Sequence, residues 1–287
     1  MPYHDHVLLL GDLAHRDFQE ARRWLRRHTQ LSEATRLEDA LANLSRGNYL
    51  DAIVVAQSRP RQFSARDIER LHGASPLSRL VALLGSWCEG EMRTGRPWPG
   101  VMRVLWHQWR PRLIPHFQPA SGAFPGNWNL PRTASVTDQL AVTTEAAWPP
   151  RHGLIAIHAR KFRDYRGLAD ACSQAGYSTV WSSPVQPLHA SGFAAVIFDG
   201  IAVDDAAAAR LRHVVRQVQP APVITLLDYV RRQDYERAVA AGSAAVIAKP
   251  LLTYDLLWHL DDLIRRPHPK KAPDGAPNSL SAPTSAA

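Results

Sequence analysis

The sequence predicts an α/β protein built from two doubly wound parallel sheets. Three observations support this: short apolar runs alternate with helical patterns, the second half repeats the layout of the first, and a Pro/Gly-rich segment separates them. The chain has 287 residues, the length of about two domains.

The first half contains three runs that are apolar on both faces, as expected of parallel strands covered by helices on two sides. These runs cover residues 7–10, 51–56 and 80–84. Helical patterns lie between these runs, over 18–28, 37–44 and 64–71. Ser64 is the expected N-cap of the last helix.

The second half repeats this order, with apolar runs over 154–157, 194–198, 223–227 and 244–248. The ends of the first two strands that we identify in each half are 45 residues apart (Gly11 to Ala56) and 41 apart (His158 to Asp199). The next strand ends 28 residues later in both halves. Matching spacing predicts a tandem duplication.

The predicted organisation has four parts. Residues 1–117 form a first domain, 118–151 a linker rich in Pro and Gly, and 152–266 a second domain. Residues 267–287 are rich in Pro, Ser and Ala, and we expect a disordered tail because they offer little apolar area to bury.

Composition argues against several classes of protein. No apolar run approaches the roughly 20 residues that cross a bilayer, and the N-terminus lacks the pattern of a secretory signal. Two Cys, Cys88 and Cys172, are too few for a disulfide framework or a Cys-rich zinc site. We expect a cytoplasmic protein without a bound metal.

The net charge of +8 is carried mainly by Arg, which supplies all but four of the 34 basic residues. The densest basic segment is 22–27. We interpret it as the exposed face of an amphipathic helix with Phe18, Ala21 and Leu25 turned inward. Nucleic-acid contact is the alternative, because a basic surface attracts polyanions.

Residues 153–265 carry two motifs: an apolar strand ending at Asp199, and Ala-Gly (241–242) followed by a short strand and Lys249-Pro250. With these motifs the second half resembles the receiver domain of bacterial two-component response regulators. The first half, 4–117, resembles it more faintly. The resemblance implies a flavodoxin-like sheet with its site at the carboxyl ends of the strands.

The resemblance implies the site of a receiver domain. There, an acidic pair after the first strand holds Mg²⁺, and an Asp ending the third strand accepts a phosphoryl group. A Lys after the fifth strand pairs with the phosphate, and a Ser/Thr and an aromatic residue relay the change. The divalent cation is needed because an anionic carboxylate must attack an anionic phosphoryl group.

In the second half, Asp199 matches the phospho-acceptor and Lys249 the phosphate-pairing Lys. The acidic-pair positions fall on His158 and Ala159, the hydroxyl position on Leu227 and the aromatic position on Val246. An ion pair of Asp199 with Lys249 is expected to close the site. Mg²⁺ would bind only if Asp199 is phosphorylated, through ligands such as Asp204 or Asp228.

In the first half, Asp12 matches one member of the acidic pair, but Gly11 occupies the other position. Ala56 occupies the acceptor position and cannot act as a nucleophile. The nearest likeness to Lys-Pro is Arg96-Pro97. Both halves therefore resemble degenerate receivers.

Residues 87–109 concentrate Trp and Arg in the region that forms the partner face of receivers. The candidates for partner contact are Trp87, Arg93, Arg96, Trp98 and Trp106. The alternative is a loop whose Trp side chains pack over the sheet edge with Arg stacked on them. We expect Cys88 to be a plain buried thiol.

These features predict a signal-transduction adaptor that acts by protein–protein contact and without phosphorylation. It would not be an enzyme and would need no cofactor, and its partners would be a kinase or an output protein. The alternatives are a phosphorylatable regulator in a phosphorelay that uses Asp199, and a basic accessory protein that binds nucleic acid. The resemblance also implies a homodimer through 235–246 and 255–263, because receiver domains often pair through this face.

Overall fold

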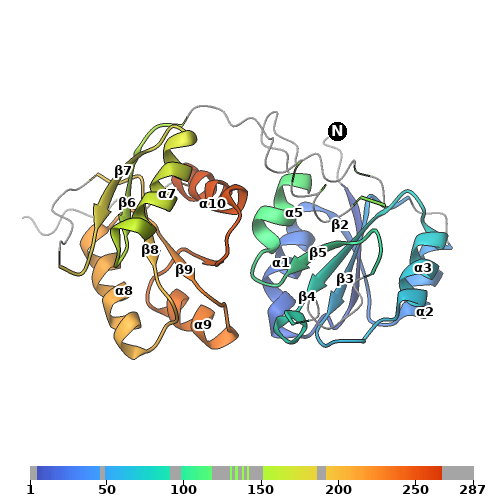
Figure 1. Ribbon diagram of the computed structural model, residues 1–287. Helices are drawn as coiled ribbons and strands as arrows, with labels where there is room; N and C mark the ends of the chain where they lie inside the picture. The colour runs from blue at the N-terminus through green and yellow to red at the C-terminus, as the bar shows by residue number, and fades with distance from the viewer. Residues whose placement is uncertain are drawn as a thin grey trace, which may run out of the picture.

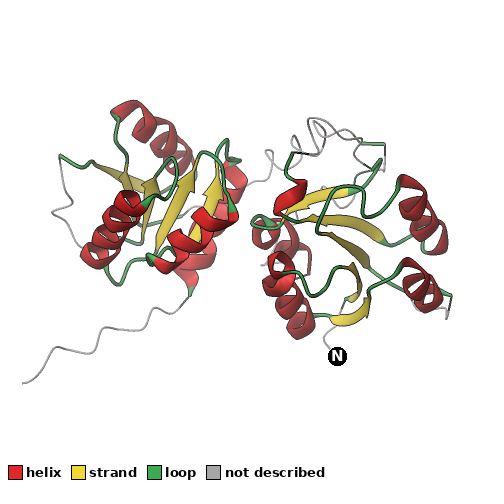
Figure 2. Cartoon of the chain, turned by 90° about the horizontal axis from the view of Figure 1, so that it is seen from below, coloured by secondary structure: helices red, strands yellow, loops and turns green. Residues whose placement is uncertain are grey.

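The computed structural model describes residues 5–45, 49–90, 98–117, 130, 133–134, 138, 141, 151–185 and 192–266. Two separate five-stranded sheets lie within these ranges, each with helices on both faces (Figures 1 and 2). Most of the predicted linker, 118–151, and all of the predicted tail, 267–287, fall outside the described residues.

The first sheet has the strand order β2-β1-β3-β4-β5, and every pair of neighbours is parallel. Its strands are β1 (His6–Gly11), β2 (Gln30–Ala34), β3 (Ala52–Gln57), β4 (Arg79–Leu84) and β5 (Met102–Leu105). One face packs against α1 (Gln19–His28) and α5 (Trp109–Phe117). The other packs against α2 (Leu37–Leu44) and α3 (Ala65–Ala74). Two 3₁₀ turns, η1 (Arg16–Phe18) and η2 (Ser86–Cys88), follow β1 and β4.

The second sheet has the order β10-β9-β8-β6-β7, again parallel throughout. Its strands are β6 (Leu154–His158), β7 (Ser178–Ser182), β8 (Ala195–Asp199), β9 (Val223–Leu227) and β10 (Ala245–Ala248). The helices α7 (Phe162–Gln174) and α10 (Thr253–Arg265) cover one face. The helices α8 (Asp205–Val218) and α9 (Arg232–Ala240) cover the other.

Numbered from its own first strand, each sheet has the order 2-1-3-4-5, which is that of flavodoxin-like folds. The predicted fold class and the duplication of the layout are therefore confirmed. The central strands explain why the apolar runs were continuous. In β1, Leu8 and Leu10 pack on the α2–α3 side, whereas Val7 and Leu9 pack on the α1–α5 side.

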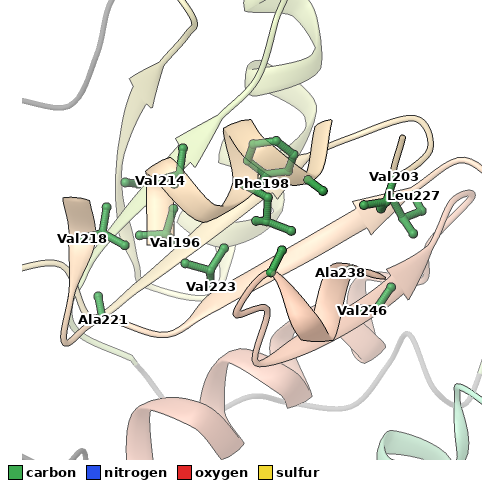
Figure 3. Packing of buried hydrophobic residues seen from close by; sticks show 14 of the residues in the cluster. Val196, Phe198, Val203, Val214, Val218, Ala221, Val223, Leu227, Ala238 and Val246 are labelled. Carbon is green, nitrogen blue, oxygen red and sulfur yellow. The ribbon is translucent and has the colours of Figure 1, made fainter. Parts of the chain in front are cut away.

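Figure 3 shows the same principle in the second domain. Val196 and Phe198 of β8 point toward Val214 and Val218 of α8, and all four side chains are buried. Burial of an aliphatic or aromatic side chain of this size contributes about 1.5–3 kcal/mol. This apolar layer holds β8, and thus Asp199 at its end, in place.

Three strands were not predicted from the sequence: β2, β5 and β7. All three are edge strands, and β2 shows why they were missed. Its sequence, Gln30-Leu-Ser-Glu-Ala, alternates between exposed and less exposed residues instead of running apolar. A strand with one partner and a solvated side lacks the continuous apolar signal of a central strand.

The helix starting after Ser64 shows a local reason for its position. Ser64 Oγ accepts a hydrogen bond from the Asp67 backbone N–H at 3.2 Å, and an Asp67 carboxylate oxygen accepts one from the Ser64 N–H at 2.8 Å. This capping box confirms the predicted N-cap. Across the described ranges, no helix is both long and apolar enough to cross a membrane.

Candidate functional site

The carboxyl ends of the strands in the second sheet bring Asp199, Asp228 and Lys249 together. Asp199 is the last residue of β8, Asp228 follows β9 and Lys249 follows β10. Lys249 Nζ lies 2.8 Å from Asp199 Oδ1 and 2.6 Å from Asp228 Oδ1. It also donates to the Gly200 carbonyl oxygen at 2.8 Å. The expected ion pair of Asp199 with Lys249 forms, and Asp228 adds a second carboxylate.

The two carboxylates hold Lys249 in its charged form. Burial lowers the pKa of the Lys249 ammonium, but the hydrogen bonds and negative charges of Asp199 and Asp228 outweigh that effect, so its pKa is raised. The Asp199 side chain is only 13% exposed, whereas that of Asp228 is 53% exposed. Asp228 can therefore leave Lys249 at the smaller cost in free energy, because water can solvate its exposed carboxylate.

His158 and Ala159, at the end of β6, bring no negative charge to this site. The His158 ring stacks on Phe198 with centroids 5.2 Å apart, and its Nδ1 lies 3.0 Å from Ser182 Oγ. Burial lowers the pKa of His158 and the charge of Arg210 adds to this effect, so the imidazole is neutral at pH 7.

Strand register places Arg160 where the first domain has Asp12. Gly11 lies opposite Ala56, whereas His158 lies opposite Phe198, one residue before Asp199. Ala159 therefore corresponds to Gly11, and the alignment assumed from sequence was one residue out. With this correction the acidic-pair positions are Ala159 and Arg160, so the acidic pair is still absent and a cation occupies one of its positions.

The donors at this edge do not suit Mg²⁺. Lys249 already occupies an oxygen of Asp199 and one of Asp228. Asp204 is instead the N-cap of α8, where its Oδ1 accepts a hydrogen bond from the Ala207 backbone N–H at 2.6 Å. Within the described ranges no three His, Cys, Asp or Glu side chains gather closely enough to hold a metal ion.

Next to Lys249 lies a pocket of about 690 Å³ between the starts of α7 and α10. Asp199, Asp228 and Lys249 line it together with Arg160, Lys161, Arg163, Asp164 and apolar side chains of α7. A volume of this order suits a small organic ligand. Asp199 is thus paired with Lys249 of the same domain, and both side chains also line a pocket large enough for a small ligand.

The corresponding edge of the first domain has a different set of residues. Ala56 occupies the acceptor position and is fully buried. The Trp106 N–H donates to the Leu84 carbonyl at 2.8 Å, as the Lys249 N–H donates to Leu227 at 2.7 Å. Trp106 is therefore the counterpart of Lys249. The suggested likeness, Arg96-Pro97, lies outside the described residues and precedes β5.

The first domain instead receives a cation from the second. Arg232, the first residue of α9, places its guanidinium carbon 4.8 Å from the centroid of the Trp106 ring, and its Nη1 lies 3.3 Å from Asp17 Oδ1. The Asp17 side chain is fully buried, and its Oδ2 accepts a hydrogen bond from the Ser86 N–H at 2.8 Å. Tyr235 completes the contact with its ring 5.0 Å from that of Trp106.

We call this contact of Arg232 and Tyr235 with Asp17 and Trp106 the interdomain latch. Trp106 is 3% exposed and packs with the buried side chains of the second domain. Cation–aromatic contact and a charged hydrogen bond to a buried carboxylate both favour the closed arrangement. Arg232 and Asp17 could not be predicted as site residues from the sequence, because neither belongs to a receiver motif.

Glu89 supports the same contact from the first domain. Its Oε1 accepts a hydrogen bond from Trp106 Nε1 at 2.7 Å. Burial raises the pKa of Glu89, against the opposing effect of its hydrogen bonds with Trp106 and Tyr229. Tyr229 lies in the second domain, so Glu89 also connects the two domains.

A second contact between the domains runs between α5 and α10, which face each other in Figure 1. Arg112 Nη2 of α5 donates to Asp255 Oδ2 of α10 at 2.9 Å. The Asp255 side chain is 5% exposed, and burial raises its pKa although Arg112 opposes the shift. Parts of the segments 235–246 and 255–263, suggested for homodimer formation, thus contact the first domain of the same chain.

The partner-contact candidates have different environments. Trp87 is 77% exposed and remains available to a partner. Trp98 is half-buried against the α2–α3 side of the first domain, as the alternative interpretation expected. Trp106 contacts the second domain of its own chain. Arg93 and Arg96 lie outside the described residues.

The arginine segment of α1 is partly neutralised. Arg22 and Arg26 both donate to the Glu33 carboxylate of β2, at 2.7–2.9 Å. The hydrogen bonds from Arg22 lower the pKa of Glu33 to about 2, despite the opposing effect of burial. This arrangement gives α1 a structural use for two of its arginines and weakens the argument for nucleic-acid contact.

No protein-family model and no curated protein matches this chain. Solved structures do. The receiver domain of the Francisella response regulator 1452 matches with 14% identity over 39% of this chain and 96% of its own, with a TM-score of 0.34. The HemR receiver domain from Leptospira biflexa has 19% identity, 43% and 100% coverage and a TM-score of 0.35.

A putative pilus assembly-related protein from Burkholderia pseudomallei also matches, with 18% identity over 39% of this chain and 88% of its own and a TM-score of 0.34. Each of these structures is similar to part of this chain. The fold stands on the strand orders above and not on these likenesses.

Proposed function

We propose that the chain is a cytoplasmic signalling adaptor built from two receiver-like domains. It acts by protein–protein contact, independently of phosphorylation and without catalytic turnover or a cofactor. Its partner is another signalling protein, such as a kinase or an output protein. The exposed Trp87 is the surface residue that this proposal assigns to partner contact.

One observation carries the proposal: at both strand-end edges a buried carboxylate is held by a cation of the same chain. In the second domain, Lys249 holds Asp199. In the first domain, which has Ala56 at the acceptor position, Arg232 holds Asp17. Such pairing favours a fixed arrangement of charges over a nucleophile awaiting Mg²⁺, because Lys249 already engages one oxygen of Asp199 and Arg232 one oxygen of Asp17.

The first experiment is intact-mass measurement after incubation with acetyl phosphate and Mg²⁺, on the wild type and on Asp199→Ala. The proposal expects no phosphate adduct in either protein. An adduct seen only in the wild type would overturn it in favour of a phosphorylatable regulator that uses Asp199. A competent receiver domain treated in the same tube serves as the positive control.

The partner-contact claim needs its own measurement. A site-specific photo-crosslinker at position 87 should capture a signalling protein in cells, whereas the same probe at Leu77, which is equally exposed at 77%, should not. Equal capture at both positions would show that residue 87 has no special role.

A further inference from the structure

The 3₁₀ turn η2 presents an exposed indole at the carboxyl-end edge of the first sheet. Trp87 is 77% exposed, although the residues on both sides of it are held in place. The Ser86 N–H donates to the buried Asp17 carboxylate at 2.8 Å, and Cys88 Sγ donates to the Gln57 carbonyl oxygen at 3.4 Å. The fold therefore fixes the position of Trp87 and leaves its large apolar ring in water, which costs hydrophobic free energy.

The loop after β3 lies beside η2 and carries two arginines. A Cβ added at Gly85 would lie 3.2 Å from Ser58 Cα, so the two loops are in contact. Arg59 and Arg61 are both exposed, and within the described ranges neither guanidinium forms an ion pair. Two uncompensated cations thus stand next to the exposed tryptophan.

The backbone of this loop has a shape that an arginine resists. The Gln62 N–H donates to the Arg59 carbonyl oxygen at 3.4 Å and closes a turn with Pro60 second and Arg61 third. Arg61 has φ 62°, which the third position of such turns usually reserves for Gly. Gln62 Oε1 also accepts a hydrogen bond from the Ser58 N–H at 2.8 Å and so rigidifies the turn. An arginine at a position that favours Gly indicates a role for its side chain.

This surface continues across the boundary between the domains. Glu89, two residues after Trp87, accepts a hydrogen bond from Tyr229 of the second domain. The Tyr229 side chain nevertheless stays largely in water, since the residue is 55% exposed. Two aromatic rings and two guanidinium groups therefore flank the interdomain latch. We call them the seam surface, which consists of Arg59, Arg61, Trp87 and Tyr229.

The acidic side chains near the seam surface do not neutralise it. The Asp17 side chain is fully buried and that of Glu89 is 7% exposed. Asp228 and Glu236 pair with cations of the second domain. Asp12 is the exception, because it is half-buried at the end of β1 and forms no ion pair within the described ranges. The seam surface thus has an excess of positive charge, and an acidic partner complements it.

We propose that the seam surface binds an acidic segment of a partner protein through an apolar side chain flanked by carboxylates. The apolar side chain packs on Trp87, and the carboxylates pair with Arg59 and Arg61 in the two-pronged geometry of guanidinium groups. The inference rests on the proposed function, since it gives the chemistry of the partner that Trp87 contacts. Nucleic acid fits less well, because two arginines neutralise fewer phosphates than the roughly six to ten of strong binders.

Binding is tested by selecting random peptides displayed on phage against the full chain and measuring the selected peptides by fluorescence anisotropy. We expect them to carry acidic residues around an aromatic or aliphatic residue. Combining Arg59→Glu with Arg61→Glu should weaken binding by roughly tenfold or more. Combining Arg212→Glu with Arg216→Glu makes the same change of charge at exposed positions of α8 and should leave binding unchanged.

Two single variants separate contact with the peptide from a role in folding. Trp87→Ala should weaken binding by roughly tenfold, whereas Leu77→Ala, at a position that is also 77% exposed, should not. Arg61→Gly should weaken binding without lowering the urea midpoint of unfolding, because Gly adopts φ 62° at no steric cost. Tyr229→Ala should weaken binding as well, and unchanged binding would overturn the part assigned to the second domain.

The proposal is overturned if the selected peptides show no excess of acidic residues, if the α8 variant weakens binding as much as the loop variant, or if Trp87→Ala binds like the wild type. It also fails if a single-stranded oligonucleotide binds the chain and the loop variant abolishes that binding, since the surface would then take nucleic acid. A phosphate adduct on Asp199 would overturn the adaptor proposal and leave peptide binding intact, so the two failures are distinguishable.

Discussion

Arg232 of the second domain and Trp106 of the first lie in cation–aromatic contact, with the guanidinium carbon 4.8 Å from the ring centroid. Trp106 corresponds in position to Lys249 of the second domain, since each donates its backbone N–H to the residue that ends the neighbouring strand. Where one domain carries its own cation, the other has an aromatic platform that receives a cation from its neighbour.

Removing the guanidinium should open the latch. We expect Arg232→Ala to increase the radius of gyration and to reduce the stability of the closed form by about 1–3 kcal/mol, because Asp17 would remain buried without its cation. Scattering and urea unfolding measure the two effects. Arg231→Ala, at the adjacent exposed position, is the matched control; equal effects of the two changes would contradict the assignment.

The Asp199–Lys249 pair should show energetic coupling. Lys249→Met leaves two carboxylates close together without a cation, and we expect a loss of about 1–2 kcal/mol. Asp199→Asn in the same chain should restore part of this loss, so the double-mutant cycle gives a coupling of about 1 kcal/mol. Strictly additive effects in chemical denaturation would mean that the pair contributes nothing to stability.

Acid should destabilise the folded protein through two buried histidines, His116 of α5 and His259 of α10. Burial lowers the pKa of His116 and of His259 to about 3, from 6.5. Between these values the unfolded chain binds a proton that the folded chain does not, so stability falls as the pH drops below 6.5. Each histidine contributes about 2 kcal/mol of this loss by pH 5. His259→Gln should flatten the pH dependence of urea unfolding between pH 7 and 5 relative to wild type.

Two glycines provide a matched test of backbone geometry. Gly11 has φ +126°, and a Cβ there would lie 2.2 Å from the Ala56 carbonyl oxygen, so Gly11→Ala should cost about 3 kcal/mol or prevent folding. Gly73, in α3, has nothing within 4 Å of an added Cβ. Gly73→Ala should therefore stabilise by roughly 0.5–1 kcal/mol. Thermal melting of both variants distinguishes the two sites.

Thiol reactivity should be low in the folded protein. Cys88 and Cys172 are both fully buried, and burial raises the pKa of Cys172 to about 12. We expect neither to react with Ellman's reagent within an hour at pH 8, and both to react at once in guanidinium chloride. Rapid labelling of one thiol in native buffer would indicate local opening around it.

The central strands could be predicted from the sequence because a buried parallel strand is apolar at every position. The Asp199–Lys249 pair was expected from the resemblance to receiver domains, which places a Lys after the fifth strand near an acid that ends the third. The edge strands β2, β5 and β7 lacked that signal. The second carboxylate, Asp228, was considered only as a metal ligand, because the sequence does not show that its side chain contacts Lys249.

The latch was beyond reach of the sequence for a different reason. Asp17 and Arg232 are 215 residues apart and lie in different domains. Neither stands in a motif, and charged residues at helix starts are usually solvated. These two side chains become neighbours only because the start of α9 packs against the carboxyl ends of the strands in the first sheet.

The latch joins two domains that share one chain, and this has a consequence for competition. A tethered surface sees its partner at an effective concentration on the order of millimolar. A free protein that recognised Tyr235 or Trp106 with micromolar affinity would therefore lose to the internal contact at ordinary cellular concentrations. The surface that the two domains share is therefore protected from weakly binding proteins. Such a protein gains access to it only when the contact of Arg232 with Asp17 and Trp106 opens.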